Sequence, residues 1–250
     1  MQSQLTCAHC PVRGLVICGG VEPADSEAMQ PSARVYRAGE LIYRERERSE
    51  DFLTILDGWA LKFTMTRDGR RQVLSFLLPG DHVALDLLGY NRLTFSVQAI
   101  TECTVCSVDR KAINRLIEAN DGVLRRLQGR YRFRRIADQE HIVSLGRRLA
   151  AGRIAYLFLE MSLRLAGRGF RDETALPFFI RQRDIADALG LTPVHVSRML
   201  REFRKEGIAE LNHMQLSILN KRRLMEISGI SEDQMDISLY GVNIQNFVTG

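Results

Sequence analysis

The sequence predicts an α+β chain in three parts: a small antiparallel β-barrel, a long charged helix, and a C-terminal pair of short helices followed by a hairpin. Three observations support this prediction. Between residues 36 and 109, short apolar runs recur about every ten residues and are separated by turn residues. From residue 121 the apolar residues follow a helical period instead, and after residue 181 two helical segments are joined by a glycine-containing turn.

Composition places the 250-residue chain among globular proteins, with 45% hydrophobic and 26% charged residues. No apolar run approaches the roughly 18 residues that a membrane span needs, and the first residues form no basic leader. We therefore expect a cytoplasmic protein with no membrane partner. In a reducing compartment, five cysteines favour metal binding or redox sensing over a disulfide framework.

The barrel is expected over residues 35–120, after a cysteine-bearing N-terminal segment of residues 1–34. Its strands are predicted from runs such as DFLTIL, ALKFTM, QVLSFLL and FSVQAI, and a short helix from Arg110 to Ala119 follows them. The turns between the runs contain Gly39, Gly58, Gly69 and the sequence Pro79-Gly80-Asp81.

Residues 121–146 are predicted to form one long dimerisation helix. Its apolar stripe is thin, and six Lys or Arg and three Asp or Glu residues interrupt it, so it is too charged to be buried in a monomer core. This pattern is typical of a two-stranded coiled-coil seam and predicts a homodimer. The expected interface residues are Leu124, Leu127, Tyr131, Asp138, Ile142 and Leu145.

The C-terminal part, residues 147–223, begins with a predicted helix from Arg147 to Ala166 and a short strand from Ala175 to Ile180. It carries fifteen Lys or Arg residues against eight Asp or Glu residues. An excess of positive charge on one segment indicates a polyanion-binding module, although a solvated basic face has the same composition. A tail of residues 224–250 follows.

Two short helices stand inside this basic part. The first, over residues 181–189, ends at Gly190, and Thr192 caps the second, which begins with Pro193. This arrangement predicts a helix-turn-helix, with a strand-turn-strand wing over residues 208–220. Such folds also serve as protein-contact modules.

The second short helix has a polar face opposite the apolar residues Val196, Met199, Leu200 and Phe203. We expect Arg198 to read a base and Ser197 to bond a base or a phosphate, while residues further along meet phosphates. The candidate DNA-binding residues are Val194, His195, Ser197, Arg198, Arg201 and Lys205.

In this order, the parts resemble the CRP/FNR family of bacterial transcription regulators over about residues 7–223. The resemblance implies an N-terminal β-roll like a cyclic-nucleotide-binding barrel, a dimerisation helix and a C-terminal winged helix-turn-helix. It also implies a homodimer that binds a palindromic site in double-stranded DNA and contacts RNA polymerase. Two positions depart from the family pattern: Arg46 stands where a glycine is common, and Val194 stands where a base-reading glutamate is common.

Cyclic nucleotide binding is not expected. Relatives that bind the nucleotide hold its phosphate with a Glu after the Pro-Gly-Asp turn and with an Arg followed by Ser or Thr. This chain has no Glu between Asp81 and Arg92, and Arg92 is followed by Leu93.

The cysteines offer a different sensor. Cys7, Cys10 and Cys18 are grouped near the N-terminus, and Cys103 and Cys106 lie near the end of the barrel. Four thiolates, three grouped and one distant, are a ligand set for an iron–sulfur cluster. The pattern resembles the oxygen-sensing FNR branch, which implies a [4Fe–4S] cluster on Cys7, Cys10, Cys18 and Cys106. In this comparison Cys103 is the spare.

Other uses of the cysteines remain open at this point. The same thiolates can bind zinc or form a redox switch, and Cys103 and Cys106 fit equally well as small buried residues without a cofactor. No enzyme motif is present, so we expect no enzyme. The remaining rival is a metal- or thiol-binding interaction protein with a basic end that binds without sequence preference.

Overall fold

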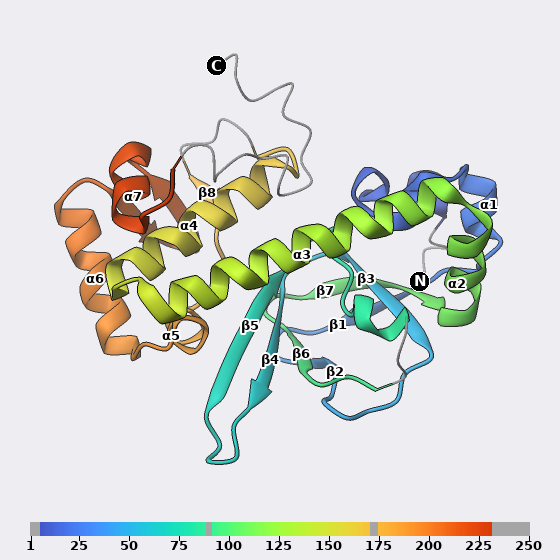
Figure 1. Cartoon of the computed structure of the whole chain (residues 1–250), viewed down its shortest axis with the longest axis horizontal. Coiled ribbons are helices and arrows are strands. Elements are labelled where there is room, and N and C mark those ends of the chain that lie inside the picture. The colour runs from blue at the N-terminus through green and yellow to red at the C-terminus, as the bar shows by residue number, and fades with distance from the viewer. Residues whose placement is uncertain (1–5, 89–91, 171–174, 232–250) are drawn as a thin grey trace. The chain divides into compact units, whose positions relative to one another are not determined.

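The computed structural model describes residues 6–88, 92–170 and 175–231 (Figure 1). The chain divides into two units, residues 1–131 and residues 132–250. The long helix α3 (Asp121–Arg147) contributes residues to both units.

The first unit contains two antiparallel sheets, and they confirm the predicted β-roll. One sheet has the strand order β1-β7-β3 and the other the order β2-β6-β4-β5. The strands are β1 (Ser32–Tyr36), β2 (Leu41–Tyr43), β3 (Asp51–Asp57), β4 (Ala60–Met65), β5 (Arg71–Leu77), β6 (Ser96–Ala99) and β7 (Cys103–Asp109).

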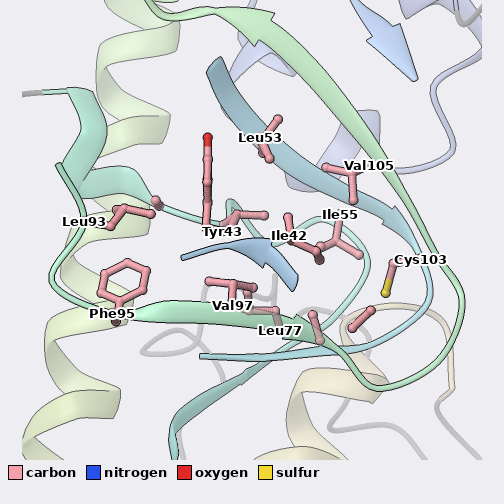
Figure 2. Packing of buried hydrophobic residues seen from close by; sticks show 14 residues of the cluster. Ile42, Tyr43, Leu53, Ile55, Leu77, Leu93, Phe95, Val97, Cys103 and Val105 are labelled. Atoms are coloured by element: carbon pink, nitrogen blue, oxygen red, sulfur yellow. The ribbon is translucent and has the colours of Figure 1, made fainter. Parts of the chain in front are cut away.

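The interior of the β-roll is filled by side chains from both sheets (Figure 2). Ile55 and Val97 are fully buried, and the ring of Phe95 packs in the same cluster. Each fully buried side chain of this size stabilises the fold by about 1.5–3 kcal/mol. The alternating apolar pattern of the strands therefore places this core where the sequence predicts it.

Several turns of the β-roll require a left-handed backbone. Gly58 has φ +82°, and a Cβ there would lie 2.1 Å from the carbonyl oxygen of Glu102, so only glycine fits. Arg46 has φ +68°, the conformation that glycine adopts without cost. A glycine at position 46 would adopt this conformation without the strain that Arg46 carries.

The first unit also contains short helices, and several of them pack together with the start of α3. A second apolar core lies among them, with Ile17, Phe52, Ile113, Val123 and Leu127 buried together. The helices are η1 (Cys7–His9), η2 (Arg13–Leu15), η3 (Ile17–Gly20), α1 (Pro23–Glu27), η4 (Leu85–Leu88) and α2 (Arg110–Ala119). In Figure 1 the cysteine-bearing segment, in dark blue, lies beside the N-terminal end of α3.

The second unit differs from the prediction at its first helix. The sequence predicts a helix from Arg147, but α3 continues through that residue and α4 (Ala150–Ala166) begins three residues later. Leu149 has φ −69° and ψ 166°, an extended conformation that interrupts the helical path. The predicted strand is also shorter, because β8 covers only Leu176–Pro177.

The rest of the second unit is a winged helix-turn-helix. Gly190 ends α5 in the left-handed region with φ +63°, as the sequence predicts. The strands β8, β10 and β9 form an antiparallel sheet in that order. Its elements are α5 (Gln182–Leu189), α6 (Pro193–Lys205), β9 (Ala209–Asn212) and β10 (Gln215–Ile218). Among the described residues, no helix is long and apolar enough to cross a membrane.

A further helix, α7 (Lys221–Ser228), crosses the boundary between residues 223 and 224, where the tail is predicted to begin. Leu224 of this helix is fully buried. Arg148 donates through Nε to the carbonyl oxygen of Ser228 at 2.7 Å and pairs through Nη2 with Glu140 at 2.9 Å. Residues 221–230 are therefore part of the second unit, and the rest of the predicted tail, residues 232–250, lies outside the described residues.

Candidate functional site

The N-terminal cysteines lie on a segment of short turns that α1 holds in place. The amide of Cys7 donates to the Oε2 atom of Glu27 at 2.7 Å, and the hydroxyl of Ser26 donates to the carbonyl oxygen of Cys18 at 3.0 Å. Cys10 ends η1 and accepts a hydrogen bond from the amide of Arg13. Hydrogen bonds to the backbone thus fix the segment that carries Cys7, Cys10 and Cys18.

The two distant cysteines point to opposite faces of β7. Successive side chains of a strand alternate between faces, so residues three apart face opposite ways. Cys103 lies in the apolar core of the β-roll, where its thiol donates to the carbonyl oxygen of Trp59 at 3.0 Å (Figure 2). Cys106 instead packs with Cys10 and Cys18 against the small cluster that contains Val16.

The structure brings the four predicted ligands together. Burial, and after it the neighbouring thiols, raise the pKa of Cys7 and of Cys106 to about 12. Cys18, Cys7 and Cys10 raise the pKa of Cys106, whereas Cys103 is not among the groups that shift the pKa of Cys106, Cys7 or Cys18. A cation or cluster at this place would stabilise the thiolates that burial disfavours.

Two arginines bring positive charge to the cysteines. Arg13 donates to the carbonyl oxygens of Cys7 and Val21, and Arg126 of α3 donates to carbonyl oxygens of the same segment. Burial raises the pKa of Cys18, while Arg13 and Arg126 lower it. Over the described ranges, no three His, Cys, Asp or Glu side chains converge in the manner of a single-ion site.

Helix α3 exposes part of the predicted seam. Leu124, Tyr131 and Ile142 are exposed apolar residues, and Ile142 keeps 69% of its surface accessible. Leu127 differs from the prediction, because it is buried in the second apolar core of its own unit. Leu145 is half-buried, with Cδ2 3.8 Å from the Cβ position of Gly190. The stripe that faces outward is consequently narrower than predicted.

Asp138 lies on the exposed side of α3 and has a partner on its own helix. Arg134, one turn earlier, places Nε 3.1 Å from the carboxylate of Asp138. The side chain of Asp138 is half exposed. Its charge is therefore partly balanced within the helix.

The helix α6 has the two faces that the sequence predicts. Val196, Met199 and Phe203 are buried against the helix-turn-helix core, which includes the buried residues Ile185 and Leu189 of α5. The opposite face carries the candidate DNA-binding residues. Four of them are exposed, namely Val194, Arg198, Arg201 and Lys205, and two are half-buried, namely His195 and Ser197.

The turn before α6 is fixed by hydrogen bonds. The hydroxyl of Thr192 accepts from the amide of His195 at 3.2 Å, as expected of an N-cap residue. Arg153 of α4 donates to the carbonyl oxygen of Leu189 at 2.8 Å and so caps the end of α5. No local pattern in the sequence predicts this role of Arg153, because its partner lies 36 residues away.

Two family models match the chain. The model described as "Cyclic nucleotide-binding domain" matches residues 33–120, and the model described as "Crp-like helix-turn-helix domain" matches residues 152–227. The first match covers the β-roll, and the second covers the helix-turn-helix, its wing and most of α7.

Curated relatives and a solved structure agree with these matches. The chain is 32% identical to the nitrogen fixation regulation protein FixK of Bradyrhizobium diazoefficiens, over 87% of this chain and 92% of the relative. It is 34% identical to the transcriptional activatory protein AadR of Rhodopseudomonas palustris, over 86% of this chain and 90% of the relative. The transcriptional activator protein FnrL of Cereibacter sphaeroides is 26% identical, over 91% and 93% respectively.

The structure of FixK2 from Bradyrhizobium japonicum superposes with a TM-score of 0.73 at 28% identity, covering 80% of this chain and 98% of that one. These relatives are regulators of transcription and not enzymes, as the sequence predicts. The chain therefore belongs to the CRP/FNR family of DNA-binding transcription regulators.

Proposed function

We propose that the protein is an oxygen- or redox-sensing regulator that holds a [4Fe–4S] cluster and binds a palindromic promoter site as a homodimer. Its ligands are Cys7, Cys10, Cys18 and Cys106. The single observation that carries the proposal is the way the fold separates the five cysteines. Cys10, Cys18 and Cys106 pack against one small apolar cluster and Cys18 and Cys10 raise the pKa of Cys7, while Cys103 is turned into the core of the β-roll. Contacts with RNA polymerase belong to the same proposal.

The donor set fits an iron–sulfur cluster better than a single zinc ion. Zinc draws four thiolates to about 2.3 Å from one centre. A four-iron cluster binds each thiolate through a different iron, so its ligands can stand further apart. Among the described residues, no three His, Cys, Asp or Glu side chains form a site for a single metal ion. When bound, such a cluster supplies a redox-active centre whose state depends on oxidants.

The protein's own groups prepare the site. Glu27 and Ser26 hold the backbone at Cys7 and Cys18, and Arg13 and Arg126 supply positive charge near Cys18. Four thiolates bring negative charge into a part-buried site, and the two guanidinium groups offset it. No cyclic nucleotide is included in the proposal, because Leu93, the residue after Arg92, is buried in the β-roll core.

In the second unit, we assign base reading to Arg198 and phosphate contact to Arg201 and Lys205. All three lie on the exposed face of α6, and Arg198 is nearest to the N-terminal turns that enter a major groove in such folds. Val194, His195 and Ser197 complete this surface. The exposed residues Leu124, Tyr131 and Ile142, with Asp138, form the seam between two copies of α3.

The two cysteines of β7 provide a matched test. The chain is purified without oxygen as wild type, Cys106→Ala and Cys103→Ala, and iron, sulfide and zinc are measured per chain. About four irons and four sulfides are expected in the wild type and in Cys103→Ala, with a large loss in Cys106→Ala. Iron-free wild type with one zinc overturns the proposal, and so does equal iron in the two variants.

A further inference from the structure

Arg126 connects α3 directly to the segment between Cys10 and Cys18. Its Nη1 atom donates to the carbonyl oxygens of Gly14 and Val16, each at 3.1 Å. A guanidinium group is charged at every accessible pH and presents its donors in a rigid fork, so it holds two carbonyl groups at once. The backbone of the cysteine segment is therefore fixed by a residue of the long helix.

A second contact joins the same two elements without any side chain. A Cβ on Gly20 would lie 3.0 Å from the carbonyl carbon of Gly122, and one on Gly122 would lie 2.9 Å from the carbonyl oxygen of Gly20. The two backbones thus approach more closely than other residues allow. A displacement of the cysteine segment has to displace the start of α3 or break this contact.

The opposite side of the same helical turns carries the exposed apolar stripe. Leu124 precedes Arg126 by two residues and lies about 200° from it around the helix. Tyr131 follows on the side of Leu124, and both are exposed. The helix therefore stands between the cysteine segment on one side and the predicted seam on the other.

From these contacts we propose that Arg126 is a positioning residue that couples the conformation of the cysteine segment to the pairing of two α3 helices. This inference rests on the proposed function, since it assigns the residue through which cluster binding reaches the dimer. When the thiols bind their cluster, the segment from Gly14 to Gly20 keeps the shape that holds Arg126. When the segment rearranges, the first turns of α3 lose both anchors and the seam weakens.

The first experiment compares Arg126→Ala with Arg125→Ala, which removes an exposed arginine at the neighbouring position. Iron and sulfide per chain and the dimerisation constant are measured for cluster-loaded and cluster-free protein by sedimentation. Compared with the wild type at equal iron per chain, Arg126→Ala should lose about tenfold in loaded dimer affinity, the scale of one charge-assisted hydrogen bond. Arg126→Lys should recover part of this loss, and Arg125→Ala should match the wild type.

If Arg126→Ala keeps the wild-type ratio between loaded and cluster-free dimerisation constants, the coupling is overturned. Hydrogen exchange on protein purified without oxygen tests the anchor separately, at the amides of Leu15 and Gly19 that donate within the segment. Arg126→Ala should speed both, and unchanged exchange rejects the anchor whether or not iron is found.

A glycine pair keeps the inference testable if the wild type carries no iron, a result that would overturn only the proposed function. Gly20→Ala forces the cysteine segment away from α3, whereas Gly14→Ala adds a Cβ that meets no atom within 4 Å. In iron-free protein, Gly20→Ala should weaken the dimer relative to Gly14→Ala. Equal dimerisation constants for the two variants reject the coupling.

Discussion

The buried imidazole of His82 accepts a hydrogen bond from the amide of Ile17, with 3.3 Å between Nε2 and the amide nitrogen. Because Nε2 accepts, Nδ1 carries the proton and donates to the hydroxyl of Thr54 at 2.8 Å. The ring also lies 5.0 Å from the ring of Phe52, measured between centroids. A neutral histidine of the β-roll thus supports the residue that precedes Cys18.

The stability of the fold should fall as the pH drops below about 6.5, partly through His82. Burial, together with the nearby Arg130, lowers the pKa of His82 to about 3, below the value of 6.5 in an unfolded chain. Between these two pH values the unfolded chain binds a proton that the folded chain does not. The free energy of unfolding therefore decreases by about 1.4 kcal/mol per pH unit on acidification through this group.

Urea unfolding between pH 5 and 7 checks this prediction in His82→Asn against the exposed control His9→Asn. The His82 variant should be less stable at pH 7 and should show a flatter pH dependence than the control. Burial also lowers the pKa of His141, so part of the pH dependence of stability remains in both variants. Identical slopes in the two variants would contradict the role given to His82.

Arg46→Gly should stabilise the protein. The residue has φ +68°, which costs a non-glycine residue about 1 kcal/mol or more, and glycine removes this strain. The gain is reduced by the greater freedom of glycine in the unfolded chain. We expect the free energy of unfolding to rise by up to about 1 kcal/mol, whereas Arg44→Gly, in the same turn region, should lower it. A loss of stability in Arg46→Gly would show that its side chain contributes more than its backbone costs.

Local rules account for the parts of the fold that the sequence predicts best. The turn between α5 and α6 depends on Gly190, Thr192 and Pro193, and each acts within a few residues of its own position. Side chains alternate between the two faces of a strand, so the three-residue spacing of Cys103 and Cys106 is enough to place them on opposite faces of β7. These features need no knowledge of distant contacts.

Long-range contacts account for what the sequence does not predict. Arg126 bonds Gly14 across 112 residues, and no local pattern encodes such a pair. A helical stripe gives the spacing of Leu124 and Leu127 but not their partners. In the folded chain Leu127 contacts the core of its own unit and Leu124 stays exposed, because the cysteine segment and α2 cover only one edge of the stripe.

Asp138→Ala should strengthen the dimer of cluster-free protein. Two copies of α3 would bring like charges together at a partly buried seam, and the substitution removes that repulsion. Arg134 balances part of the charge through its 3.1 Å contact, so we expect a gain of only a few-fold. Sedimentation of the apo protein measures the dimerisation constant. Ile142→Asp, which adds a charge to the same seam, should weaken the dimer. An unchanged constant for Asp138→Ala means that this residue faces water in the dimer.

Substitutions on α6 should distinguish the residue that reads a base from a residue that contacts phosphate. Arg198→Ala should cost about 1–3 kcal/mol on the specific site and almost nothing on random DNA, because a bidentate guanine contact is lost. Arg201→Ala should weaken both complexes alike and flatten the salt slope by about one unit. Titrations on specific and scrambled duplexes at two salt concentrations measure these effects. If Arg198→Ala keeps the wild-type ratio of affinities, this residue is not the base reader.

Val194→Glu should change the preferred half-site at one base pair. Val194 is among the most exposed apolar residues, with 78% of its surface accessible. A carboxylate at this position can accept from the N4 donor of a cytosine, which valine cannot. Selection of duplexes from random DNA by the two proteins should recover different bases there. Identical selected sequences would show that position 194 does not reach the base edges.

If a cluster on Cys7, Cys10, Cys18 and Cys106 controls DNA binding, the loss of iron has to weaken that binding. Oxygen-free protein is titrated onto a palindromic duplex that it has selected from random DNA, and iron is measured in the same samples before and after exposure to air. We predict that specific affinity falls in proportion to the iron lost, and that Cys103→Ala behaves as the wild type. Specific affinity that stays constant while iron falls, or that persists in iron-free protein, would contradict the account.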